Sequence, residues 1–267
     1  MALVINTNFA SLSAQRNLAT NSLKLSVSVQ RLSSGLRINS AKDDAAGLVI
    51  SEGLRAQIRA VNVAVRNAQD GISMAQTAEG AMAEIGNMLG RMKELAEQAS
   101  QGTLGADART AVSTEYENLL TEIGRIKDSS QFNGAALLTG DTVSLQVGSA
   151  STDTVSITMG DFSLTTVTGA MDTEGAARTA LDALDVDIAA VAGERGKMGA
   201  VQNTLESTIN NLRITSENLS AAESSIRDTD FAYESSQFTK NQILVQAGTA
   251  MVAQANVLPQ AALQLLK

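Results

Sequence analysis

The sequence predicts a mainly α-helical protein. We expect an elongated antiparallel helical bundle, in which both chain ends contribute coiled-coil helices, with one small β-hairpin region. Three observations support this. Proline occurs once in 267 residues, at Pro259, whereas Ala, Leu, Gln and Glu are abundant, and this composition suits long uninterrupted helices. Apolar residues recur at alternating steps of four and three over long stretches. Two short runs alternate apolar with polar residues around a turn-rich linker.

The first half of the chain predicts three helices. Near the N-terminus two apolar stripes share one helix, which therefore needs neighbours on two sides. A second helix over Leu54–Ala99 would be about 70 Å long at about 1.5 Å per residue. A third helix has Asp107 at its N-cap and a seam from Val112 to Ile126. The two N-terminal stripes are Leu18, Leu25, Val29, Leu32 and Leu36, and Leu12, Ala19, Leu23 and Val27.

The helical spacing of apolar residues stops after residue 128, and loop and strand patterns replace it. The segment SSQFNGAALLTGD (129–141) is expected to be a loop, and two alternating runs predict a β-hairpin near 142–160. A further helix is expected over 174–222. Its seam is interrupted in one heptad column by Arg195, Gln202 and Ser216, and polar residues in such a column usually set the register of the helices.

The C-terminal stretch 241–266 contains no charged residue but keeps the four–three rhythm. Its Asn and Gln residues argue against a bilayer span, so the helix is expected to be buried against other copies of the chain. The expected assembly residues are Leu18, Leu25, Val29, Leu32, Leu36, Leu244, Gly248, Met251, Ala255 and Leu258.

Composition removes several functional classes. The chain has no His and no Cys, so the commonest general base and thiolate chemistry are both missing. We therefore expect no enzyme activity, cofactor or metal. A pI near 4.7 argues against a nucleic-acid partner, and no run of 18 apolar residues predicts a membrane span. The N-terminus lacks the basic and apolar regions of a secretory signal.

Two local patterns suggest chemistry but are better explained by helix structure. Asp43 and Asp44 are more typical of solvated charges at a helix start than of paired catalytic carboxylates. GERGKMG (193–199) fails the phosphate-loop spacing. Its glycines, three apart, are expected to let another helix approach closely.

Several long motifs resemble those of bacterial flagellin, in order and over nearly the whole chain. They are MALVINTN (1–8), QRLSSGLRINSAKDDAAGLVIS (30–51), LGRMKELAEQAS (89–100), SSQFNGAALL (129–138), SSIRDTDFAYE (224–234) and QILVQAGTAMVAQAN (242–256). The resemblance implies a structural subunit that self-assembles into the flagellar filament for swimming motility. It also implies a terminal domain of 1–42 with 225–267 at the filament core and a middle domain of 43–224, without outer variable domains. A hook–filament junction protein of the flagellum is the alternative.

The same resemblance implies partners and a location. The partners are other copies of the chain, an export chaperone and the export apparatus, the filament cap and junction proteins, and host flagellin-sensing receptors. The location is the extracellular filament, reached by export without a cleaved signal peptide. A Toll-like receptor would recognise Arg91, Leu95 and Glu115, although Gly90 replaces a usual Gln. A plant receptor kinase would bind Gln30–Ser51, a segment expected to be helical and hidden in the filament, through Gln30, Arg37, Asn39, Lys42, Asp43, Asp44 and Gly47.

Overall fold

The computed structural model describes residues 7–160 and 171–264, with side chains up to residue 257. The helices are α1 (Phe9–Ser34), α2 (Ala45–Ala99), α3 (Ala106–Ser129), α4 (Glu174–Arg227) and α5 (Phe231–Gln264). The strands are β1 (Gln131–Phe132), β2 (Ala135–Ala136), β3 (Thr142–Gln146) and β4 (Thr154–Thr158). The chain divides into two compact units, residues 1–56 with 218–267 and residues 57–217. The division falls inside α2 and α4.

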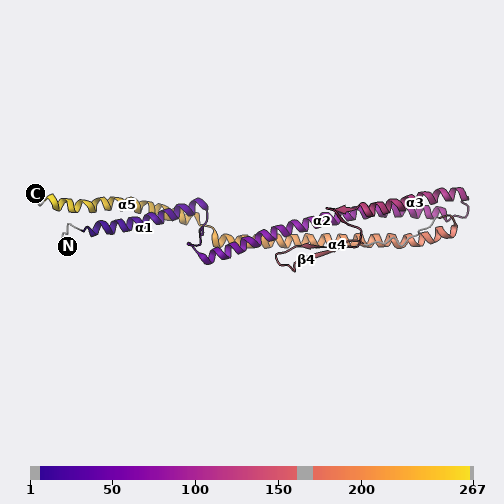
Figure 1. Cartoon of the computed structure of the whole chain (residues 1–267), viewed down its shortest axis with the longest axis horizontal. Helices are drawn as coiled ribbons and strands as arrows, with labels where there is room; N and C mark the ends of the chain where they lie inside the picture. Colours follow the sequence, from indigo (N-terminus) through magenta and orange to yellow (C-terminus); the bar gives the residue numbers. More distant parts are fainter. Residues whose placement is uncertain (1–6, 161–170, 265–267) are drawn as a thin grey trace. The chain divides into compact units, whose positions relative to one another are not determined.

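The terminal unit contains the antiparallel helices α1 and α5, which lie side by side with both chain ends at one end of the pair (Figure 1). Asn8 caps α1, because its side-chain oxygen accepts a hydrogen bond from the Ser11 amide at 3.0 Å. Gly35 ends the helix in the left-handed conformation, with a φ of 72°. Leu36 therefore lies beyond α1, and the prediction that it continues the helical stripe is wrong.

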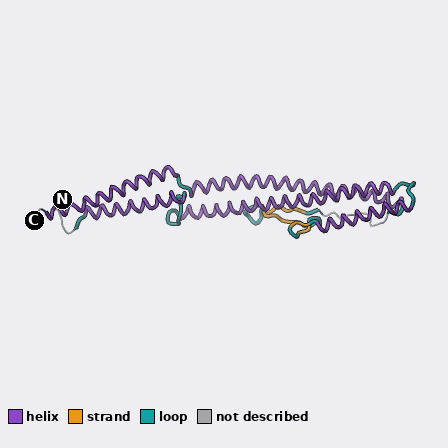
Figure 2. Tube along the Cα trace, turned by 90° about the horizontal axis from the view of Figure 1, so that it is seen from above, coloured by secondary structure: helices purple, strands orange, loops and turns teal. Residues whose placement is uncertain are grey.

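In the middle unit α2, α3 and α4 lie side by side (Figure 2). Three polar pairs fix α4 antiparallel to α2: Ser216 with Asn62 at 3.4 Å, Gln202 with Glu79 at 3.0 Å, and Lys93 with Asp185 at 2.5 Å. Arg195 also lies 3.7 Å from Glu79. The three polar interruptions of the α4 seam thus all meet polar groups of α2, as expected of residues that set the register.

The core of this unit consists of the seam residues of the three helices together with the β region. The sequence placed its main members correctly: Met82, Ile85, Leu89, Met92, Tyr116, Ile123, Leu184, Val191, Met198 and Leu205 are all buried. Tyr116 packs with its hydroxyl out of contact with solvent. Burial, reinforced by the charge of Asp187, raises the pKa of Tyr116 to about 12. Tyr116 therefore remains neutral at any physiological pH.

The predicted hairpin is confirmed as the antiparallel pair β3–β4, with Val143 opposite Ile157 and Leu145 opposite Val155. A second pair, β1–β2, was missed, because residues 129–141 were expected to be a loop. Its turn is Asn133–Gly134, and both residues have positive φ, at 49° and 82°. Asn–Gly is the strongest short-range hairpin signal, so this pair could have been predicted from the sequence.

Several helix limits also differ from expectation. Helix α2 begins at Ala45 rather than Leu54, because the Asp44 carboxylate accepts a hydrogen bond from the Gly47 amide at 2.9 Å and so caps the helix start. Gly105, not Asp107, is the N-cap of α3, and Asp107 lies in its first turn. Helix α4 extends beyond residue 222 to Arg227. Residues 161–170, between β4 and α4, lie outside the described residues.

The glycines of 193–199 do not serve close helix packing, which corrects the expectation above. A Cβ atom built on Gly193, Gly196 or Gly199 meets no atom within 4 Å. By contrast, a Cβ on Gly71 would overlap Leu145 of the hairpin and lie 3.1 Å from Leu205. Gly71 is therefore the glycine that makes room for the hairpin on α2.

These two sites predict opposite outcomes for the same substitution. Gly196→Ala should raise the free energy of unfolding by about 0.5–1 kcal/mol, because alanine restricts the unfolded chain and fits the exposed helix. Gly71→Ala should lower it, because the Leu145 side chain must give up its packed position against α2. Thermal melting followed by circular dichroism measures both changes. Equal stabilisation by the two variants would show that the hairpin does not depend on Gly71.

Candidate functional sites: the terminal helix pair and two recognition segments

Helices α1 and α5 are joined by polar contacts along their length. At one end the Asn8 side-chain amide donates to the Ala255 carbonyl at 2.8 Å, and the Ser11 hydroxyl donates to Asn256 Oδ1 at 2.8 Å. At the other end Arg31 pairs with Glu234 at 3.5 Å, and Glu234 is only 4% exposed. These contacts fix the register of two segments that are more than 200 positions apart in the chain.

The same pair leaves large apolar side chains in contact with solvent. Phe9 is 72% exposed and Leu23 70% on α1, and Met251 is 61% exposed and Ile243 58% on α5. Several large apolar side chains exposed along one helix pair indicate a candidate interaction surface. The expected second stripe of α1 is therefore present, and in the single chain its large members Leu12, Leu23 and Val27 are left exposed.

The ten expected assembly residues fall into three groups. Leu18, Leu25 and Leu32 are half-buried on the side of α1 that faces α5, and Ala255 is buried opposite them. Val29, Leu244 and Met251 are exposed, and Gly248 packs against Leu18. Leu36 lies in the connection after α1, and the side chain of Leu258 lies outside the described residues.

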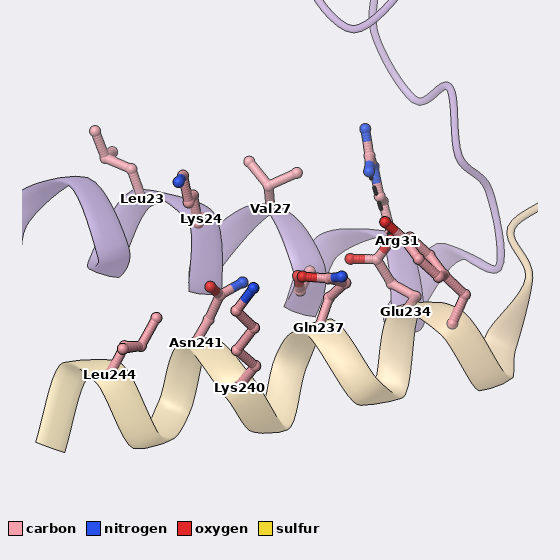
Figure 3. A pocket seen from close by; sticks show the side chains of 11 residues that line it. Leu23, Lys24, Val27, Arg31, Glu234, Gln237, Lys240, Asn241 and Leu244 are labelled. Carbon is pink, nitrogen blue, oxygen red and sulfur yellow. Dashed lines mark hydrogen bonds and ion pairs between the residues drawn. The ribbon is translucent and has the colours of Figure 1, made fainter. Parts of the chain in front are cut away.

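One side of the α1–α5 pair is grooved. A groove of about 520 Å³ has charged residues in its lining, namely Lys24, Arg31, Glu234 and Lys240. Figure 3 shows Glu234, Gln237 and Asn241 rising from α5 toward α1, with Arg31 against Glu234. Leu244 joins this groove to a second one of about 420 Å³, whose lining has no charged residue. The pair thus offers a neighbour one polar section and one uncharged section.

The predicted recognition segment Gln30–Ser51 is helical only at its two ends. Residues 35–44 form a connection that is tied to the end of α4: the Arg37 amide donates to the Arg227 carbonyl at 2.7 Å, and the Arg37 guanidinium donates to the Ile226 carbonyl at 2.6 Å. Ile38 is buried beneath it. The expectation of a continuous helix through this segment is wrong, because Gly35 ends α1 and Asp44 starts α2.

The polar residues of that segment have distinct roles. Asp43 accepts hydrogen bonds from the Asn39 and Ser40 amides at 3.2 and 2.9 Å and from the Ser40 hydroxyl at 3.0 Å. Gly47 is buried, and a Cβ there would lie 2.6 Å from both Asp44 Oδ2 and Ile38 Cδ1. Gln30 and Lys42 are exposed. Glycine at 47 is thus required for the close fit of the connection on α2.

Sequence reasoning missed the ion pair beside this connection. Glu52 of α2 lies 2.7 Å from Arg227 at the end of α4, and this hydrogen bond, followed by that to Arg55, lowers the pKa of Glu52. The charges were visible in the sequence, but their separation of 175 positions gives no local signal.

The Asp43 turn predicts a local acid sensitivity. Hydrogen bonds from Ser40, and then from Asn39, lower the pKa of Asp43 below its ordinary value of 3.8. Its stabilising effect is therefore complete above about pH 4 and is lost as the pH falls through the lowered pKa. The protection factors of the Asn39 and Ser40 amides, which are their exchange rates relative to an unstructured chain at the same pH, should fall over that range. Asp43→Ala is the control, since it removes the acceptor and its protection factors should be low already at pH 6 and should lack this acid transition.

The second predicted recognition site brings Arg91 of α2 and Glu115 of α3 together. The Arg91 guanidinium donates to Glu115 Oε1 at 2.9 and 3.1 Å and to Glu94 at 2.8 Å. These hydrogen bonds raise the pKa of Arg91, and the bond that Arg91 donates to Glu94 has the largest effect. Leu95 is 2% exposed and belongs to the core. The structure therefore places Leu95 beneath this surface, not on it beside Arg91.

The described helices include none with the length and apolarity needed to cross a bilayer.

Known protein families match this chain over both of its helical regions. Residues 5–142 match the model of the bacterial flagellin N-terminal helical region, and residues 181–266 match that of the C-terminal helical region. The curated relatives include a flagellin of Halalkalibacterium halodurans, 48% identical with 99% of this chain and 100% of that protein covered. A flagellin of Bacillus subtilis is 42% identical, with 98% and 99% covered. A flagellar filament 33 kDa core protein of Treponema phagedenis is 39% identical, with 99% and 100% covered.

Two solved structures are also similar. A crystal structure of Bacillus cereus flagellin has a TM-score of 0.51 at 35% identity and covers 55% of this chain and 88% of its own. A putative flagellar hook-associated protein from Vibrio parahaemolyticus has a TM-score of 0.62 at 15% identity, with 70% and 100% covered. At that identity the second likeness concerns the fold alone.

Proposed function

This chain belongs to the bacterial flagellin family, and from that premise we propose that its copies polymerise into the flagellar filament through the exposed apolar surfaces of α1 and α5. The chain is a structural filament subunit and not an enzyme. Its short middle region, in which α3 is followed by two small strand pairs and then α4, fits a minimal flagellin without outer domains.

One observation carries the proposal. The helix pair formed by the two chain ends exposes Phe9, Leu12, Leu23, Ile243 and Met251 together. Burial of such apolar surface against neighbouring copies contributes about 25 cal/mol per Å². Because each copy presents these side chains along two helices, many copies can bury them in one assembly.

Seeded growth tests the proposal. Purified full-length chain should elongate short filament fragments, and electron microscopy should show filaments that lengthen with added protein. If the protein remains monomeric at every concentration with active seeds, it is not a polymerising subunit.

The alternative, a junction protein between hook and filament, has weaker support. The hook-associated likeness at 15% identity concerns fold, whereas the curated relatives that cover the whole chain are flagellins and filament core proteins. Copy number would separate the two: a filament subunit should be present in thousands of copies per flagellum, and a junction protein in a short ring.

The other partners follow from the same surfaces. Before assembly the exposed apolar face of α5 would need a cytoplasmic export chaperone. The chain would then pass through the flagellar export apparatus without removal of a signal peptide, and meet the filament cap and junction proteins at the extracellular filament. Mass spectrometry of the secreted chain should find its N-terminal residues, and a start far downstream would contradict this route.

We propose that the animal flagellin-sensing receptor contacts Arg91 and Glu115, whose side chains are 52% and 50% exposed. Arg91→Ala should reduce receptor signalling by monomeric protein by about tenfold, as for a charged contact at an interface. Arg178→Ala, which removes a similar exposed pair with Glu174 on α4, is the matched control and should leave signalling unchanged. Equal signalling by all three proteins would exclude Arg91 from recognition.

For the plant receptor kinase, the peptide Gln30–Ser51 remains the proposed epitope, with contacts from Gln30, Arg37, Asn39, Lys42, Asp43, Asp44 and Gly47. The connection 35–44 is held by Asp43 and Ile38 in the folded chain, so an extended peptide must be released before it binds. A synthetic peptide should trigger the response, and Asp43→Ala in the peptide should weaken it. The free peptide contains no folded helix pair or middle unit, so Asp43→Ala in the peptide cannot act by destabilising the folded chain.

A further inference from the structure

The uncharged groove of the α1–α5 pair has a floor of small residues. Ala10 and Ala14 of α1 and Ala247 and Gly248 of α5 line it, with Asn17 and Met251 among the others. Its volume is about 420 Å³. Small residues at this place allow close approach because a Cβ on Gly248 would already lie 3.1 Å from Leu18 Cδ1. The groove therefore suits apolar side chains of moderate size and no charge.

A ridge of matching chemistry lies on the back of α5. Ile243, Ala250 and Val257 are spaced by seven residues, so they fall on one side of the helix. Asn241 and Ala255, which are buried toward α1, each lie two positions from a ridge residue and hence on the opposite side of α5. All three ridge residues are exposed, and no charged residue occurs anywhere in 241–257.

We propose that the ridge Ile243–Ala250–Val257 of one copy packs into the Ala10–Ala14–Gly248 groove of the next copy. This inference rests on the proposed polymerisation and specifies its contact. The groove lies between α1 and α5, whereas the ridge lies on the outer side of α5, with Ala247 at the border between them. A copy whose groove is filled therefore still presents its own ridge. Such a heterologous contact adds copies without limit unless its rotation closes a ring, so it produces an open filament.

A second row of exposed side chains competes for the groove. It is the row on α1 that contains Phe9, Leu12 and Leu23. Arg16 and Lys24 accompany that row, and the desolvation of charges beside an uncharged groove is costly. The charge-free ridge of α5 is the better occupant.

The test is elongation of wild-type seeds by purified full-length variants. Ile243→Lys and Ala10→Glu should each slow elongation at least tenfold, and the double variant should regain much of the rate because the two charges meet across the contact. The Ala10 site tolerates a carboxylate, since it lies in the exposed first turn of α1. Ile243→Ala, which keeps an apolar exposed helix, should give an intermediate rate without any folding effect.

Matched controls introduce the same charges on the same helices, at exposed positions outside the ridge and the groove. Gln242→Lys lies beside the ridge on α5, and Ser26→Glu lies on α1 outside both grooves and outside the apolar stripes; both residues are exposed. Neither should slow elongation more than twofold. Circular dichroism should show equal helix content in every variant.

The outcomes separate this inference from the proposed function. If the wild-type protein fails to elongate seeds, the polymerisation proposal itself is wrong. If the wild-type protein elongates and Ile243→Lys, Ile243→Ala and Ala10→Glu all match it, the ridge and groove are not in contact, although the chain still polymerises. If Leu12→Lys stops growth while Ile243→Lys does not, the α1 row fills the groove and the ridge assignment is overturned.

Discussion

Removal of residues 241–267 should abolish polymerisation completely. The deletion takes away the ridge, the whole α5 wall of the uncharged groove and Gly248, which packs against Leu18 of α1. Most helical stability in proteins comes from packing of the apolar face, so α1 should lose much of its helix content when most of α5 is removed. Size-exclusion chromatography with light scattering should show a monomer at concentrations where the full chain grows on seeds.

The same truncated chain also has an internal control. The middle unit, residues 57–217, lies outside the deletion, so its thermal transition should stay within a few degrees of that of the full chain. Filaments formed by the truncated protein would show that the end of α5 is dispensable. A collapsed middle unit would show instead that the deletion acts through folding.

Leu89→Ala should cause the largest loss of stability among single changes in the middle unit. Leu89 is completely buried on α2 within the common core of α2, α3 and α4. Loss of its side chain should lower the free energy of unfolding by about 2–5 kcal/mol, from lost burial and from the cavity left behind. Urea denaturation of the monomer, followed by circular dichroism, measures this.

Val186→Ala is the matched control for that variant. Val186 is also a helical aliphatic residue of the middle unit, but it is exposed, and its truncation should cost about 0.5 kcal/mol or less. Similar losses in the two variants would mean that Leu89 is not part of a tightly packed core.

The helices and their inward faces could be predicted because four–three spacing is a local signal. Met82, Leu89, Leu184 and Leu205 were each placed correctly by this spacing alone. Helix ends were less predictable, because single residues decide them. Leu36 follows Leu32 at a helical step, yet Gly35 ends α1 before it, and the carboxylate of Asp44 starts α2 earlier than the apolar rhythm suggests.

The candidate sites depended on contacts that a sequence does not display. Arg91 and Glu115 were linked only through resemblance, and the structure supplies the ion pair that joins them. Leu95 is one helical turn from Arg91, but α3 and α4 pack against α2 and bury that side chain. The grooves needed the register of α1 on α5, which depends on contacts such as Asn8 with Ala255 across 247 positions.

That same contact has a kinetic consequence. The first helix of the chain finds its partner only in the last one, so the α1–α5 pair has close to the greatest sequence separation that the chain allows. Pairings of such high contact order form slowly, because the intervening chain must first lose entropy. The hairpin and the short link from α2 to α3 involve far nearer residues. During synthesis the middle unit can therefore begin to fold while α1 waits for the ribosome to release α5.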